Sequence, residues 1–202
     1  MQAHAADVRT AAVDPPGCEI IGSEKFCAAI LISGKIEPGD ADRVNAFFSR
    51  IDQSATGSLP IRIGLAYLDS PGGNVSEAMK IGRLLRSRQV GTFITIDSFC
   101  ASACVLILAS GVHRAAAGPV EIHSFYSPGF LGTGDFVGAN RQYEVLSRAV
   151  EEYLREMRVP RTLLDEMIKV PHSMSRRLSL EETINLGLLG IDPVYAQVRK
   201  SK

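Results

Sequence analysis

The chain has 202 residues, of which 46% are hydrophobic and 22% charged, and this ordinary globular composition excludes a disordered or fibrous protein. Lys and Arg together number 22, as do Asp and Glu, so the chain lacks the basic excess of a nucleic-acid-binding protein. The longest apolar run covers 101–109, about half of the roughly 18 residues that a bilayer requires. We therefore expect no nucleic-acid partner and no membrane span.

The N-terminal region bears on where the protein works. Residues 1–17 are rich in Ala, Asp and Pro, which predicts a flexible lead-in before a single domain over 18–202. Ala3-His4-Ala5 has the small-x-small form of a signal-peptidase site, although no basic and apolar regions precede it. The pattern favours a periplasmic or secreted protein that lacks its signal peptide here; a cytoplasmic protein is the alternative.

Four cysteines allow two disulfides. Cys18 and Cys27 are separated by eight residues, and we expect them to pair in an oxidising compartment. Cys100 and Cys104 can also bond, but they are the less favoured pair because a bond there would stiffen the turn around Ser102. Neither pair has a second Cys or His pair at zinc-site spacing, and four buried thiols are the alternative. No metal or organic cofactor is expected.

Strands and helices alternate along the first two thirds of the chain. Apolar, β-branched runs predict strands, and apolar residues at helical spacing predict helices. The expected strands are 28–36, 61–68, 90–96 and 119–123, and the expected helices are 40–51, 75–85 and 100–109. Such alternation with short connections predicts parallel β-α units.

The last third departs from this pattern. A Gly-rich stretch precedes a long amphipathic helix over 139–157, and a short helix follows over 163–168. A long helix outside the β-α pattern is typical of an arm or of a surface between subunits, so we expect a homo-oligomer. The alternative is that this helix packs back on its own core.

Two short segments carry residues suited to nucleophilic chemistry. The turn at 70–73, Ser-Pro-Gly-Gly, has bare backbone amides that can form part of an oxyanion hole, although it also fits an ordinary loop. Ser102 lies where a strand is expected to lead into an apolar helix, a position that suits a nucleophile or a helix cap. His123 ends a strand, where it can act as a base or serve the fold.

Five motifs occur in order at coherent spacing: 68–73, 101–104, 111–114, 121–123 and 178–188. Together they resemble the ClpP/crotonase superfamily, which includes the proteolytic subunit of the Clp protease, over residues 28–196. The similarity is greater to periplasmic ClpP-like bacterial proteins in which Cys flanks the Ala-Ser-Ala core.

This resemblance implies an α/β fold built as a spiral of β-β-α units with a protruding handle helix at about 139–157. Subunits of such proteins meet through the handle, face to face, in rings. The resemblance also implies that Ser102 is the nucleophile and His123 its general base, with an oxyanion hole made by the N–H groups of Gly73 and Ala103.

One position departs from the family. Counting back four residues from Ser179 gives Ser175 where the protease has the Asp that orients its His. A serine hydroxyl can accept the imidazole N–H, but it does not stabilise imidazolium as a carboxylate does. The chain is therefore a slower Ser–His enzyme, an enzyme using another acid such as Asp135 or Asp165, or a scaffold with a vestigial site.

The favoured function is a serine peptidase-like hydrolase that cleaves small or unfolded polypeptides through acyl transfer. The alternative is a catalytically weak or inactive ClpP-like module that binds an extended peptide beside the strand at 90–96. Crotonase-type acyl-thioester chemistry is less favoured, as is a Ser–Lys dyad with Lys80 or Lys169.

Overall fold

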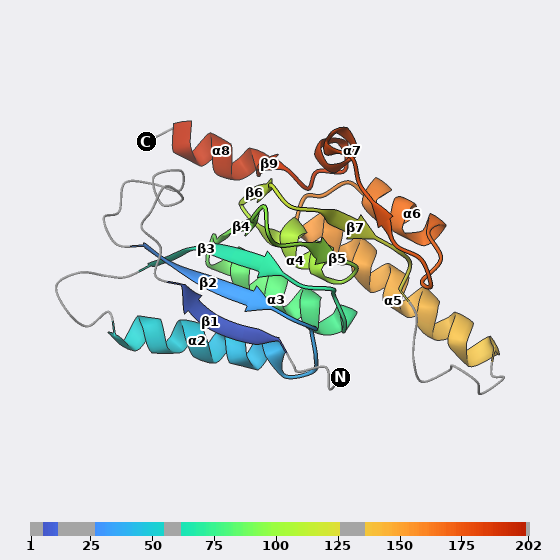
Figure 1. Ribbon diagram of the computed structural model, residues 1–202, viewed down its shortest axis with the longest axis horizontal. Coiled ribbons are helices and arrows are strands. Elements are labelled where there is room, and N and C mark those ends of the chain that lie inside the picture. Colours follow the sequence, from blue (N-terminus) through green and yellow to red (C-terminus); the bar gives the residue numbers. More distant parts are fainter. Residues whose placement is uncertain (1–5, 12–26, 55–61, 126–135, 201–202) are drawn as a thin grey trace.

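The computed structural model describes residues 6–11, 27–54, 62–125 and 136–200. Within these ranges the fold is mixed α/β, with one six-stranded sheet and one three-stranded sheet (Figure 1). The larger sheet has the order β1 (Asp7–Ala11), β2 (Cys27–Ser33), β3 (Arg62–Asp69), β4 (Gly91–Ile94), β6 (His113–Ala116) and β9 (Gly190–Ile191). The smaller sheet has the order β5 (Cys100–Ala101), β7 (Val120–Ile122) and β8 (Arg176–Arg177). The helices are α2 (Asp40–Ser54), α3 (Val75–Ser87), α4 (Cys104–Ser110), α5 (Phe136–Glu156), α6 (Thr162–Lys169), α7 (Leu180–Asn185) and α8 (Pro193–Lys200).

The centre of the larger sheet confirms the expected parallel β-α units. Strands β2, β3, β4 and β6 run parallel, whereas β1 and β9 pair antiparallel at the two edges. Helix α3 packs against both α2 and α4, and it lies behind β2 and β3 in the view of Figure 1. Every residue of α4 is buried, which explains its unbroken apolar sequence. This helix therefore forms the centre of the core.

Five of the described strands, β1, β5, β6, β8 and β9, were not expected. Residues 7–11, assigned to the flexible lead-in, pair with residues 29–33 as strand β1, so that expectation is wrong for this stretch. His113, in a segment where no strand was expected, lies in β6. The sequence of β6, His-Arg-Ala-Ala, has no apolar periodicity that would predict a strand. Its buried Arg114 is tolerated because carbonyl groups accept the hydrogen bonds of the guanidinium.

Arg114 joins three segments that are far apart in the sequence. Its guanidinium donates to the carbonyls of Gly111 (2.9 Å), Gly187 (2.7 Å) and Met157 (2.7 Å). Burial, together with the neighbouring charge of Arg86, lowers the pKa of Arg114 to about 10. The end of α5 and the end of α7 are thereby fixed to the larger sheet.

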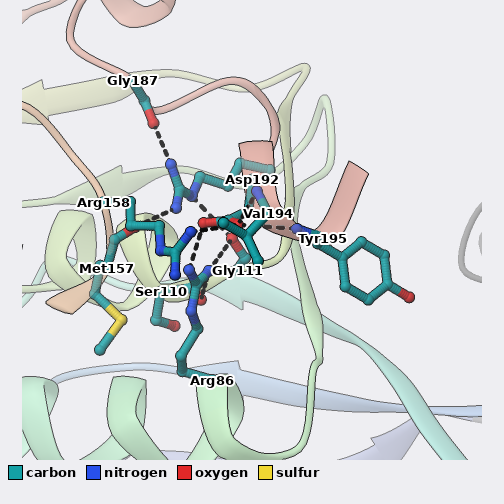
Figure 2. A network of polar contacts seen from close by, with 10 residues as sticks. Arg86, Ser110, Gly111, Met157, Arg158, Gly187, Asp192, Val194 and Tyr195 are labelled. Atoms are coloured by element: carbon teal, nitrogen blue, oxygen red, sulfur yellow. Dashed lines mark hydrogen bonds and ion pairs between the residues drawn. The ribbon is translucent and has the colours of Figure 1, made fainter. Parts of the chain in front are cut away.

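Asp192 ties the C-terminal helix to the same cluster. Its carboxylate is buried and forms an ion pair with Arg86 of α3, while Arg158 lies 3.9 Å away. Its Oδ1 accepts the N–H groups of Val194 (3.0 Å) and Tyr195 (3.2 Å), so it caps α8 (Figure 2).

Helix α5 has a packed half and an exposed half. Near its C-terminal end Val150, Tyr153 and Leu154 are buried, and Tyr153 Oη donates to the Leu106 carbonyl of α4 over 2.7 Å. Toward its N-terminal end, Val137 is 82% exposed, and in Figure 1 this end of α5 extends beyond the two sheets. Across the described ranges, no helix is both long and apolar enough to cross a membrane.

Candidate active site

Ser102 occupies the turn between β5 and α4. Its φ is 56°, a left-handed conformation that costs a residue other than glycine roughly 1–3 kcal/mol and persists only where the surroundings impose it. The Ser102 N–H donates to the Glu121 carbonyl over 3.0 Å, and the Ser102 carbonyl accepts the N–H of Val105 over 3.0 Å. In the part of the chain that the structure describes, the side-chain hydroxyl of Ser102 has no hydrogen-bond partner. The backbone of Ser102 is therefore held on both sides, and the lone pairs of its hydroxyl are available.

The Gly72-Gly73 turn packs directly against Ser102. Gly72 has φ +90°, and a Cβ at this position would lie 2.7 Å from the Cβ of Ser102. Gly73 has φ +142°, and a Cβ there would lie 2.2 Å from the Ile36 carbonyl oxygen. The buried Ser70 hydroxyl supports the turn by accepting the Gly72 N–H over 3.1 Å. Only glycine fits both positions, and its small size lets the two turns touch.

The two amides expected in the oxyanion hole are available. Neither Gly73 nor Ala103 donates its N–H to any group in the described residues. The N–H groups just before them, those of Gly72 and Ser102, are hydrogen-bonded. A Cβ on Gly72 would lie 2.8 Å from the Ala103 nitrogen, so the two amides belong to turns in contact. Such unpaired N–H groups are the donors that a developing oxyanion needs.

His123 follows β7 and lines the same pocket as Ser102, Gly72 and Gly73, a pocket of about 700 Å³. The His123 Nδ1 lies 2.8 Å from the carbonyl oxygen of Ser124. A carbonyl can only accept, so Nδ1 carries the hydrogen and Nε2 keeps its lone pair. The imidazole is therefore in the tautomer that a general base requires.

One side of the pocket is apolar. It is formed by Val75, Phe125, Tyr143, Leu146 and Ala149, the last three from α5. The rings of Phe125 and Tyr143 stack at a centroid distance of 5.5 Å. This side of the pocket suits an apolar group of a ligand.

Ser175 and His123 lie at the same end of the β7–β8 ladder, but the serine is not hydrogen-bonded to the base. The ladder ends where Ile122 pairs with Arg176, and His123 and Ser175 are the next residues on the two segments. The Ser175 hydroxyl, however, donates to Oε2 of Glu121 over 2.7 Å. The imidazole N–H meets the Ser124 carbonyl. The role of Ser175 as the group that orients His123 stays a prediction.

Three of the other candidate acids and bases do not line the pocket. Asp165 on α6 forms an ion pair with Arg161, and Lys80 and Lys169 pair with glutamates one helical turn away. None of the three side chains lines the pocket. Asp135 lies outside the described residues.

The cysteines give a mixed outcome. Cys100 and Cys104 form a disulfide, so the less favoured pair is bonded, and it encloses Ser102. Cys18 and the side chain of Cys27 lie outside the described part of the chain, and their pairing stays a prediction. No group of three or more His, Cys, Asp or Glu in the described ranges is arranged to hold a metal ion.

Sequence reasoning missed two residues that contact the base or its neighbourhood. The Ser124 carbonyl carries no side-chain signal, so its contact with the imidazole was not predictable. Glu121 could have been noticed, because it is two residues before His123 on a strand and therefore shares its face.

Comparison with known proteins finds no family model that matches the chain and no curated protein that matches it. Its function is therefore inferred from the chemistry of the Ser102 pocket.

Proposed function

We propose that the protein is a serine peptidase-like hydrolase that cleaves peptide bonds in small or unfolded polypeptides. One observation carries the proposal: an unpaired serine hydroxyl, in a left-handed turn, shares a pocket with a histidine whose Nε2 is free to accept its proton. The Ser102 hydroxyl makes no hydrogen bond within the described residues, so it does not hold the fold together in that way.

The proposed reaction is acyl transfer. Ser102 Oγ attacks the peptide carbonyl carbon while His123 Nε2 removes the hydroxyl proton. The carbonyl oxygen becomes negatively charged and accepts hydrogen bonds from the N–H groups of Gly73 and Ala103. His123 then gives its proton to the leaving amine nitrogen. A water molecule, deprotonated by the same base, attacks the ester and releases the new carboxylate and free Ser102.

The base acts without a carboxylate on its Nδ1. A carbonyl oxygen can fix the tautomer, but it stabilises the positive charge of imidazolium less than a full negative charge does. Loss of that carboxylate in trypsin-type enzymes lowers turnover by about 10⁴, so we propose a slow peptidase.

We place the mixed α/β fold within the ClpP/crotonase superfamily, with α5 as the handle of a homo-oligomer. The succession of parallel strands and helices supports this placement, as does the exposed N-terminal half of α5. A periplasmic or secreted location is supported by the Cys100–Cys104 disulfide, since such bonds persist in oxidising compartments.

A second candidate is a peptide-binding or assembly module with a weak or inactive site. The observation that favours it is the carbonyl, rather than a carboxylate, at His123 Nδ1. The apolar side of the pocket would then hold a peptide side chain without cleavage.

Labelling with a fluorophosphonate tests the hydrolase. The wild type should be labelled at Ser102, Ser102→Ala should not be labelled, and His123→Ala should be labelled at least about tenfold more slowly. Ser87 is an exposed serine on α3, and the control variant Ser87→Ala should be labelled at the wild-type rate. Equal labelling of the wild type and Ser102→Ala would refute the nucleophile. Labelling without cleavage of any member of a peptide library would favour the binding module.

A further inference from the structure

We propose that the Cys100–Cys104 disulfide is the element that positions Ser102 for attack, a role that rests on the proposed hydrolase. The bond joins the first residue of β5 to the first residue of α4, and their Cα atoms are 5.3 Å apart. Ser102 lies midway between the two cysteines. The bond thus encloses the nucleophile in a very short covalent loop.

The conformation of Ser102 needs such a restraint. A left-handed serine relaxes to a more common backbone conformation unless its neighbours hold it. On the strand side, the N–H groups of Cys100 and Ala101 are bonded to Pro119 and Ser70, both at 3.0 Å. On the helix side, α4 is short and its first residue follows Ala103, which provides no side-chain cap.

The missing cap is consistent with catalysis. A capping side chain fixes the start of a helix by accepting its first N–H groups, and these are the groups that lie near Ser102. A disulfide fixes the start of α4 without accepting any hydrogen bond. The Ala103 N–H therefore stays available for an oxyanion while the turn remains held. From the sequence, this disulfide was disfavoured because it would stiffen the turn around Ser102. Under the proposed role, that stiffening is the function of the bond.

Both cysteines are fully buried, and the rest of α4 is buried as well. Loss of the bond should therefore leave the helix in the core and loosen mainly the turn. We expect the rate of acylation to fall and the initial binding of a reagent to change little, because the pocket walls from α3 and α5 do not depend on the bond. Small misplacements of reacting groups lower rates by about tenfold to a hundredfold.

The test compares the wild type with Cys100→Ala/Cys104→Ala. Fluorophosphonate kinetics separate the binding constant from the maximal labelling rate, and amide hydrogen exchange reports on the Ser102 and Val105 N–H groups. Ile107→Val removes a buried methylene from the same helix and is the control for a general loss of stability. We expect the double variant to label about tenfold to a hundredfold more slowly with an unchanged binding constant, and to exchange faster at these two amides but not in β2 and β3.

If the double variant does not fold, the wild type itself provides the measurement. A dithiol reductant transfers two electrons and two protons, the S–S bond breaks into two thiols, and the reductant becomes its own disulfide. The labelling rate should then fall in proportion to the fraction reduced, as counted by mass, and should recover on reoxidation.

Three results decide the proposal. Labelling and exchange at wild-type rates in the double variant, or in the reduced wild type, overturn it. An equal slowing in Ile107→Val also overturns it, because the effect would then reflect general destabilisation. Faster exchange at Ser102 in a protein whose wild type never labels supports the role of the bond in holding the turn and refutes the proposed hydrolase.

Discussion

The Ser175 hydroxyl donates a hydrogen bond of 2.7 Å to the carboxylate of Glu121. Glu121 lies two residues before His123, and Ser175 and His123 lie at the same end of the β7–β8 ladder. The Glu121 carboxylate is bonded to a serine, and the imidazole Nδ1 donates instead to the Ser124 carbonyl. Among the described residues, Nδ1 therefore has a carbonyl and not a charged group as its partner.

Ser175→Asp should accelerate the reaction. The new carboxylate would lie at the same end of the β7–β8 ladder as His123, and a carboxylate that accepts the Nδ1–H stabilises the imidazolium formed during attack. We expect fluorophosphonate labelling to be at least about tenfold faster, in line with general-base contributions of roughly 10²–10⁴. Glu121→Gln/Ser175→Asp is the matched variant that removes the like charge. Ser175→Ala should label at the wild-type rate, and a tenfold loss there would show that the serine does orient the base.

Gly72→Ala should abolish labelling. The new Cβ would lie 2.7 Å from the Ser102 Cβ and 2.6 Å from the Ala101 carbonyl oxygen, so the catalytic turn would have to move. Gly39→Ala is a close control, since Gly39 has φ +96° with no atom within 4 Å of the added Cβ. Both variants carry similar backbone strain, and only the first displaces Ser102. Mass spectrometry of the labelled proteins measures the difference, and equal labelling of the two would contradict the contact.

Asp192→Asn should destabilise the protein at neutral pH and weaken its response to acid. Burial raises the pKa of Asp192, but the hydrogen bonds from Arg86 and from the Tyr195 and Val194 amides outweigh it, so the pKa lies below its ordinary value of 3.8. A carboxylate with a lowered pKa stabilises the fold fully above the unfolded value and loses that contribution as the pH falls toward the folded one.

Removing one partner of this buried pair should lower the free energy of unfolding by about 3 kcal/mol at pH 7. Urea denaturation at pH 7 and at pH 3 measures both effects. Asp52→Asn, which removes an exposed ion pair with Arg88, should cost less than about 1 kcal/mol. If Asp192→Asn kept the full acid sensitivity of the wild type, another carboxylate would be responsible.

Val137→Asp should weaken self-association. Val137 is 82% exposed on the half of α5 that extends from the body, and a charge there would oppose packing against a second copy. We expect sedimentation velocity at tens of micromolar to show an oligomer for the wild type and a smaller species for the variant. Ile184→Asp, on α7 and 53% exposed, should keep the wild-type assembly. A monomeric wild type would contradict the role of α5 as a contact.

Local signals in the sequence were sufficient for several helices. A helix was expected over 75–85, and α3 is found there, with the Oδ1 of Asn74 accepting the Glu77 N–H over 2.9 Å as its cap. The long helix was expected at 139–157 and is found at Phe136–Glu156. These features depend on residues close together in the chain, so periodicity and capping predict them.

Features set by distant pairing were missed. Cys100 and Ala101 were expected in a helix, but they form a strand because they pair with Val120 and Glu121. The left-handed turn at Ser102 comes directly after this paired segment, and no local pattern indicates it. The site residues were therefore found from motifs, whereas their conformation and partners depend on the register between segments.

Helix α5 lines the Ser102 pocket on one side and is exposed toward its N-terminal end, so a contact with the exposed part would bear on the width of the pocket. Tyr143, Leu146 and Ala149 form one wall of the Ser102 pocket, and Tyr153 fixes the far end of the helix to α4. Because that end is held, a contact that pushes on the exposed end of α5 would rotate the helix about Tyr153. A small rotation would widen or narrow the space beside the nucleophile, so a neighbouring subunit could set the size of side chain that the pocket admits.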